Sequence, residues 1–320
     1  MKERIAAYDI AKGILICLLI IHHIPEVACS MMGIDDSLLN GFCKIQKPLF
    51  VCYFMQAFFM ISGICSNFEG DYKNFLLKQI KALLIPSLVF TLLSRAAFGV
   101  LGWNILKNFV KYGGDIWFLV ALFVGKIIYY WCHKYLKDIW ILPILLLLSF
   151  LGTIINTYDL FPNYWYNRQV MDLTVMLVIG RLLARNLTDP RWWYSGVLYV
   201  SVVLICILSK INLPHVTLGF GTTICNWPLH VVLSVSGTIF LLKICHSFKS
   251  DFLAFWGRNS IVVYIWPMLL WLVSYYKPLF AVNNYSSLIA CVGLFATVIL
   301  LCYIVTNILN CKYLKWMIGR

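Results

Sequence analysis

The strongest constraint on the fold of this chain is a series of apolar runs, many of them close to 20 residues long. A lipid bilayer offers no hydrogen-bond partners, so segments that cross it satisfy their backbone groups within helices or closed barrels. The strict alternation of apolar and polar residues that is typical of barrel strands is absent. The sequence therefore predicts an all-α, polytopic membrane helix bundle. About ten transmembrane helices are expected, at residues 7–27, 48–66, 82–101, 116–132, 139–156, 170–185, 193–209, 218–242, 259–276 and 286–308.

The placement of Lys and Arg predicts how these helices are oriented. If the amino terminus lies inside the cell, the inner loops and ends contain sixteen basic residues and the outer loops contain seven. Cytoplasmic loops carry the excess of Lys and Arg, so both termini are predicted to be cytoplasmic. Because the loops are short, residues 1–320 are expected to form one membrane domain with no appended soluble domain.

Composition argues against a nucleic-acid-binding protein and against a protein built on disulfides or a cysteine metal site. The net charge of +13 lies in short loops between apolar runs, whereas nucleic-acid binders gather basic residues on a soluble face, so no nucleic-acid partner is expected. Most of the twelve cysteines fall inside apolar runs and no C-x-x-C occurs, so they are interpreted as small hydrophobic residues. The histidines are scattered, and no metal site is predicted from them.

The first apolar run places ionisable residues where lipid-facing helices exclude them. Lys12 and His23 are eleven residues apart, which puts them about 20° apart around a helix and about 16–17 Å apart along its axis. Intramembrane ionisable residues are functional candidates. An elongated ligand with an anionic head at Lys12 and a reactive end at His23 would use such a stripe. The alternative is that Lys12 extends to the inner headgroups and that His22 and His23 sit at the outer interface.

Several stretches of the chain resemble one family of membrane enzymes. In sequence order and spacing they are similar to the acyltransferase-3 family of integral-membrane O-acyltransferases, of the carbohydrate O-acetyltransferase type. That family has a basic residue, ten residues and then a histidine in its first helix, which corresponds to Lys12 and His23. The stretches are YDIAKGILICLLIIHH (8–23), FFMISGIC (58–65), KQIKALLIP (78–86), DIWFLVALF (115–123) and GRNSIVVYIWPMLL (257–270).

The sequence departs from the family pattern in two of these stretches. One is the late motif, at residues 257–270, and the other is the basic run, at residues 78–86. Pro267 stands where the family usually has a histidine, so no catalytic role is assigned to that position. Lys78 and Lys81 stand where arginines are commoner, which keeps the charge but loses the bidentate geometry that arginine offers to phosphate.

The resemblance implies transfer of an acyl group, usually acetyl, from cytoplasmic acyl-CoA to a hydroxyl of a cell-surface or lipid-linked glycan. It further implies an integral protein of a bacterial cytoplasmic membrane, in contact with membrane lipid. Lys12, Lys78 and Lys81 are expected at the inner ends of the first three helices, where the phosphates of acetyl-CoA would bind. His23 is the expected general base, because the pKa of imidazole lies near working pH. An acyl-histidine intermediate remains an alternative.

Further residues are site candidates, each with a structural alternative. Glu26 is expected to orient His23, or to be a solvated carboxylate. Asp9 joins the donor site, or pairs with Lys12. The expected substrate-binding residues are Ser62, Trp117, Arg95, Arg168 and Tyr264. For these the alternatives are helix packing for Ser62, interface anchoring for Trp117, and ion pairs with Asp115 or Asp172 for the two arginines.

A transporter or flippase for a lipid-linked sugar or small polar solute is the alternative function. It predicts broken helices at matching positions of two inverted repeats, and no such repeat is visible. The sequence leaves open the acceptor, the acyl chain length and the formation of homo-oligomers.

Overall fold

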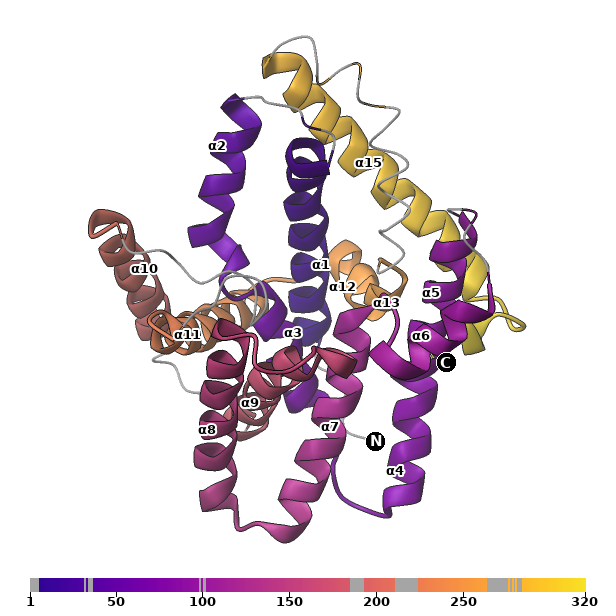
Figure 1. Cartoon of the computed structure of the whole chain (residues 1–320). Helices are drawn as coiled ribbons and strands as arrows, with labels where there is room; N and C mark the ends of the chain where they lie inside the picture. The colour runs from indigo at the N-terminus through magenta and orange to yellow at the C-terminus, as the bar shows by residue number, and fades with distance from the viewer. Residues whose placement is uncertain are drawn as a thin grey trace.

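The computed structural model of the chain describes residues 6–31, 33, 37–97, 99, 102–184, 193–210, 224–263, 276, 278, 280 and 284–320. Among these residues the secondary structure is entirely helical, as predicted (Figure 1). The α-helices are α1 (Ala6–Glu26), α2 (Ser37–Gln46), α3 (Phe54–Cys65), α4 (Tyr72–Gln79), α5 (Ile85–Ala97), α6 (Trp103–Tyr112), α7 (Trp117–Tyr135), α8 (Asp138–Thr157), α9 (Asn167–Leu183), α10 (Trp193–Leu208), α11 (Trp227–His246), α12 (Asp251–Arg258), α13 (Ser260–Val263) and α15 (Asn284–Leu309). Short π-helical segments are η1 (Val27–Met31), η2 (Lys47–Val51) and η3 (Ile80–Leu84), and 3₁₀ turns are η4 (Tyr164–Tyr166) and η7 (Lys315–Ile318).

Six helices in the described part of the chain are long and apolar enough to cross a bilayer, and a seventh crossing arises if the bent pair α6–α7 is one span. The chain is therefore a multi-pass helical membrane protein. The count of ten stays a prediction. The expected segments 170–185 and 193–209 correspond to α9 and α10, of 17 and 16 residues. Most of the expected segment 259–276 falls outside the described residues.

Two spans begin well before the apolar runs that predicted them. The second runs from Ser37 to Cys65, with η2 joining α2 to α3, and the third runs from Tyr72 to Ala96, with η3 joining α4 to α5. The added turns contain lysines and other polar residues, so hydropathy does not reveal them although their residues form helix. The carboxylate of Asp71 accepts the backbone N–H of Asn74 at 3.1 Å and so fixes the start of α4.

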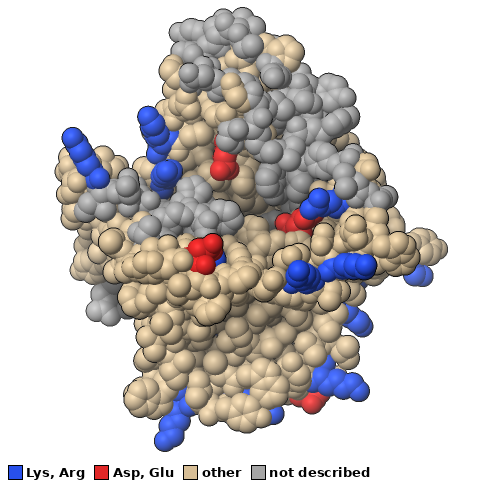
Figure 2. Space-filling view, viewed as in Figure 1, with Lys and Arg blue, Asp and Glu red and all other residues tan. Residues whose placement is uncertain are grey.

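The face of the molecule in Figure 2 has a broad uncharged surface in the lower half of the view, over α7 and α8. Lys and Arg side chains lie along its lower edge. The long apolar helices α8 and α15 leave many of their large side chains exposed, including Leu147, Leu151 and Ile289. Exposed apolar bands bordered by charge are the surface that hydrocarbon covers.

Backbone contacts at glycines set two helix pairs of the bundle. A β-carbon placed on Gly63 of α3 would lie 1.9 Å from the carbonyl oxygen of Leu177 in α9, and one on Gly180 would lie 2.0 Å from that of Met60. The central helix α1 meets α12 in the same way, because a β-carbon on Gly257 would lie 1.7 Å from the carbonyl oxygen of Asp9. Small residues allow membrane helices to approach this closely.

Replacing Gly63 with alanine is expected to lower the thermal unfolding temperature of the protein. The new methyl group overlaps a backbone carbonyl, so α3 and α9 must separate, and overpacking of this kind costs about 1–3 kcal/mol. Thermal unfolding in detergent micelles measures the change. Gly41→Ala in α2 is the matched control, since no atom lies within 4 Å of its added β-carbon. Equal unfolding temperatures for the two variants would contradict the close approach.

Candidate active site

The carboxyl end of α1 brings two histidines and one glutamate together. The helix continues through Pro25 to Glu26 and then into η1. His23 Nδ1 lies 3.1 Å from Glu26 Oε2, and His22 Nε2 lies 3.5 Å from the same oxygen. The side chains of His23 and Glu26 are 21% and 42% exposed. Glu26 thus contacts the ring of His23, and both side chains are partly exposed.

His22 is the buried member of this cluster. Its ring packs edge-on against Phe54 of α3, with ring centroids 5.8 Å apart. Its Nδ1 lies 2.9 Å from Gln46 Oε1, and the Gln46 amide nitrogen donates to the carbonyl oxygen of Ile21 at 3.3 Å. Gln46 was not among the residues that the sequence singled out. The contact joins residues 24 positions apart, so only the packing of α2 against α1 creates it.

A basic cluster gathers around α7. Lys126 is half-buried and donates to Gln79 Oε1 at 3.3 Å. Lys12 and Lys78, two residues expected to bind the donor, are near enough to contribute to its electrostatic environment. Lys81 is exposed on η3, with its backbone against Gly319. Sequence analysis missed Lys126 as a member of this cluster, because it lies in the interior of an apolar run.

Three other candidates lie in packed surroundings. Asp9 is buried on α1, where its backbone meets Gly257. Ser62 is half-buried beside the α3–α9 contact, and Trp117 begins α7 with its ring edge-on to Phe118 at 6.0 Å. The late-motif residues Tyr264 and Pro267 lie outside the described residues.

Arg95 lines a pocket of about 230 Å³. Its guanidinium makes two hydrogen bonds of 2.7 Å to the carboxylate of Asp115, one of the pairings considered as an alternative to substrate binding. The pocket lies between α5, α6 and the turn before α7, and is lined by Thr91, Arg95, Gly102, Asn104, Ile105, Asn108, Phe109, Gly114 and Asp115.

Tyr166 lies beside this pocket and donates its hydroxyl to the carbonyl oxygen of Gly114. Burial, followed by the Asp115 carboxylate, raises the pKa of Tyr166 to about 12. The phenol is therefore neutral at physiological pH, and the guanidinium of Arg95 and the carboxylate of Asp115 carry the charge at this site.

Arg168 secures the turn between α8 and α9. Its guanidinium donates to the carboxylate of Asp159, to the carbonyl oxygen of Phe161 and, at 3.3 Å, to Asn156 Oδ1. These contacts hold the turn that reverses the chain. Arg168 is thus paired with Asp159, and neither Asp172 nor Asp115 is its partner in the described hydrogen bonds and ion pairs.

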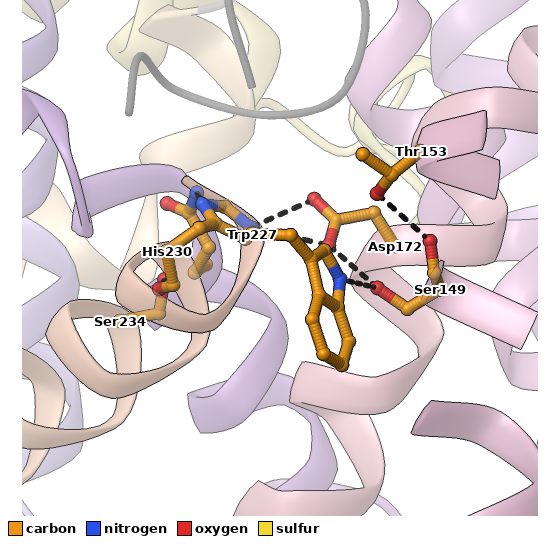
Figure 3. Close-up of polar contacts among 7 residues, drawn as sticks. Ser149, Thr153, Asp172, Trp227, His230 and Ser234 are labelled. Atoms are coloured by element: carbon orange, nitrogen blue, oxygen red, sulfur yellow. Dashed lines mark hydrogen bonds and ion pairs between the residues drawn. The ribbon is translucent and has the colours of Figure 1, made fainter. Parts of the chain in front are cut away.

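A buried contact between a histidine and an aspartate, which was not predicted from the sequence, links α9 to α11 (Figure 3). His230 Nε2 lies 3.0 and 3.1 Å from the two oxygens of Asp172, and both side chains are fully buried. Ser149 of α8 donates to Asp172 Oδ1 at 3.2 Å and accepts from Trp227 Nε1 at 2.9 Å. The group holds three helices together through polar contacts.

An apolar groove of about 260 Å³ lies between α1, α2 and α15. The α1 residues that line it, Ile21, Ile24 and Pro25, belong to the same turns as His22, His23 and Glu26. The groove is therefore at the level of the histidine cluster.

Comparison with known proteins gives one match. A family model described as an acyltransferase domain matches residues 5–307, nearly the whole chain. No curated protein and no solved structure matches the chain.

Proposed function

Since this chain belongs to the acyltransferase-3 family, we propose that it is a membrane O-acyltransferase with His23 as its general base. The donor is cytoplasmic acetyl-CoA, and the acceptor is a hydroxyl of a cell-surface or lipid-linked glycan. The observation that carries this assignment is the 3.1 Å contact between His23 Nδ1 and Glu26, on the same uninterrupted helix as Lys12.

The proposed step is direct attack by the acceptor oxygen. When His23 Nδ1 donates to Glu26, its Nε2 carries the lone pair and accepts the hydroxyl proton. The oxygen–carbon bond forms at the thioester carbonyl, the carbon–sulfur bond breaks, and the thiolate of CoA leaves. Glu26 stabilises the imidazolium that results. Glu26 is accordingly a positioning residue.

The basic residues Lys12, Lys78 and Lys126 support a phosphate-bearing donor, because ammonium groups that influence one another electrostatically also attract phosphates. Lys12 and His23 are eleven residues apart on α1, which corresponds to about 16 Å along the axis. That length suits a ligand with phosphates at one end and a reactive group at the other.

Two pockets have linings that suit the proposed acceptor, a lipid-linked sugar. The pocket around Arg95 offers asparagines, a carboxylate and an aromatic ring, the side chains that bind sugar hydroxyls and ring faces. The apolar groove beside Ile24 suits the hydrocarbon part of a lipid-linked sugar. The acceptor is therefore proposed to be lipid-linked.

The test is release of CoA thiol from acetyl-CoA by the purified protein, with and without lipid-linked glycan acceptors. Acceptor-stimulated release is expected, together with acetyl ester on the recovered glycan. If acetyl-CoA neither binds nor reacts while lipid-linked sugar crosses reconstituted vesicles, the protein is a transporter and the proposal is wrong.

Replacing Lys126 with glutamine is expected to raise the KM for acetyl-CoA about tenfold, with a smaller effect on kcat. A hydrogen bond to a charged group contributes about 1.5–3 kcal/mol, and about 1.4 kcal/mol is tenfold in affinity. Initial rates at varied acetyl-CoA measure both constants. Lys107→Gln, which removes an exposed lysine of α6, is the matched control. Equal KM values for the two variants would remove Lys126 from the donor site.

A further inference from the structure

His22, His23 and Glu26 together have the composition of a metal site. The possible ligand atoms of the three residues all lie within 4.8 Å of one another. Glu26 is the shared partner, because it is four residues after His22 and three after His23, so both rings reach its carboxylate on a continuous helix. Two imidazoles and one carboxylate form a set that binds zinc and leaves a fourth position open.

Gln46 fixes the orientation of the His22 ring. The Gln46 amide nitrogen donates to the Ile21 carbonyl, so the Gln46 oxygen is the atom that faces His22 Nδ1. That oxygen accepts, and His22 Nδ1 must therefore carry a proton. In the neutral ring, Nε2 then presents its lone pair to the Glu26 carboxylate, 3.5 Å away.

A lone pair that faces a carboxylate is unfavourable unless a positive charge lies between them. A zinc ion supplies that charge and also uses His23 Nδ1. With zinc–nitrogen and zinc–oxygen bonds of about 2.0–2.2 Å, tetrahedral ligand atoms lie about 3.3–3.5 Å apart. The observed separations of 3.1 and 3.5 Å from the Glu26 oxygen to the two rings are close to this value. A protonated His22 would also satisfy Glu26, with His23 Nδ1–H donating to the same oxygen, so a direct measurement of zinc binding distinguishes the two arrangements.

We propose that His22, His23 and Glu26 bind a zinc ion that inhibits acyl transfer, with Gln46 orienting His22. The contact between His22 Nδ1 and the Gln46 amide oxygen is typical of metal sites, where the other ring nitrogen of a ligating histidine donates to a fixed acceptor. The exposed fractions of His23 and Glu26 give a small ion access to the site.

Inhibition follows from the tautomer of His23, and this part of the inference rests on the proposed function. As the general base, His23 keeps its proton on Nδ1, against Glu26, and its lone pair on Nε2. Zinc bound at Nδ1 requires the lone pair there, so the proton moves to Nε2 and the ring stays neutral. Nε2–H cannot accept the proton of the acceptor hydroxyl. Zinc also withdraws the Glu26 carboxylate from its positioning role.

Zinc binding is measured first, on the purified full-length protein after treatment with a chelator. Equilibrium dialysis against zinc is expected to show a single ion per chain, with affinity lowered at least about tenfold by His22→Ala. His246→Ala, which removes an exposed histidine at the end of α11, is the matched control and should leave binding unchanged. If His22→Ala does not fold, His22→Gln retains most of the side-chain volume and takes its place.

Acyl transfer is then measured with and without zinc, each variant being compared with its own metal-free rate. Zinc is expected to inhibit the wild type and the His246 variant and to lose this effect in the His22 variant. Absence of zinc binding, or binding that does not depend on His22, overturns the site. Binding that depends on His22 but leaves the rate unchanged or raises it overturns the inhibitory role. Because dialysis does not require activity, it tests the site even if the proposed function fails.

Discussion

Replacing His23 with alanine is expected to lower kcat for acyl transfer about 10²–10⁴-fold, the range that a positioned general base contributes. The KM for acetyl-CoA should change little, because the donor phosphates are proposed to bind around Lys12, about three helical turns from His23 on α1. The loss is specific to proton transfer, since His23 lies at the end of α1 and is partly exposed. Thermal unfolding close to that of wild type is expected for the variant.

Two further variants make the measurement decisive. Glu26→Gln keeps a hydrogen-bond acceptor at 3.1 Å from the ring but removes the charge that stabilises the imidazolium. It should lower kcat by less than His23→Ala does and leave KM in place. His246→Ala, which removes a histidine outside the site, should retain the wild-type kcat. Wild-type turnover by a folded His23→Ala protein would eliminate His23 as the base.

Replacing Asp172 with alanine is expected to destabilise the fold by at least about 1–3 kcal/mol, the cost of leaving a buried hydrogen-bonding group without its partner. The change leaves the ring of His230 and the hydroxyl of Ser149 buried without the carboxylate that they contact. Unfolding in detergent micelles, by heat or by titration with a denaturing detergent, measures the loss.

The contrast with an exposed pair controls for the removal of a carboxylate. Asp159 also pairs with a cationic side chain, but its carboxylate is 85% exposed, so Asp159→Ala should cost about 1 kcal/mol or less. The double change of Asp172 and His230 to alanine should cost less than the sum of the two single changes, because neither buried side chain then lacks its partner. Additive costs would mean that the two residues do not interact.

The sequence predicted the features that depend on local periodicity. The first apolar run corresponds to α1, and the last corresponds to α15, within a few residues at each end. The family resemblance is confirmed by the match over residues 5–307. The early starts of the second and third spans were not predicted, because lysines in α2 and α4 lower the local hydropathy without breaking the helix.

Features that depend on tertiary packing could not be predicted. The contact between His22 and Gln46 requires α2 to lie along α1, and the pair of Asp172 and His230 joins residues 58 positions apart. Charge alone suggested an arginine as the partner of Asp172, whereas burial selects a histidine, which enters a low-dielectric interior at less cost than a guanidinium. Nothing in the sequence around Asp172 or His230 indicates that these two residues pair.

The backbone contact between α1 and α12 has a consequence for biosynthesis. Gly13 meets Leu253, and Asp9 meets Gly257, so the helix that carries Lys12 and His23 is seated against a segment made about 240 residues later. At about 5–20 residues per second, ribosomes need roughly 10–50 s for that length. Throughout this interval, α1 is in the membrane without α12, the helix whose backbone packs against Gly13. A polypeptide released before residue 251 contains the proposed base and all of the proposed donor cluster, yet it lacks α12, against which α1 packs. Enzyme activity is therefore expected to appear only after α12, at residues 251–258, has been inserted.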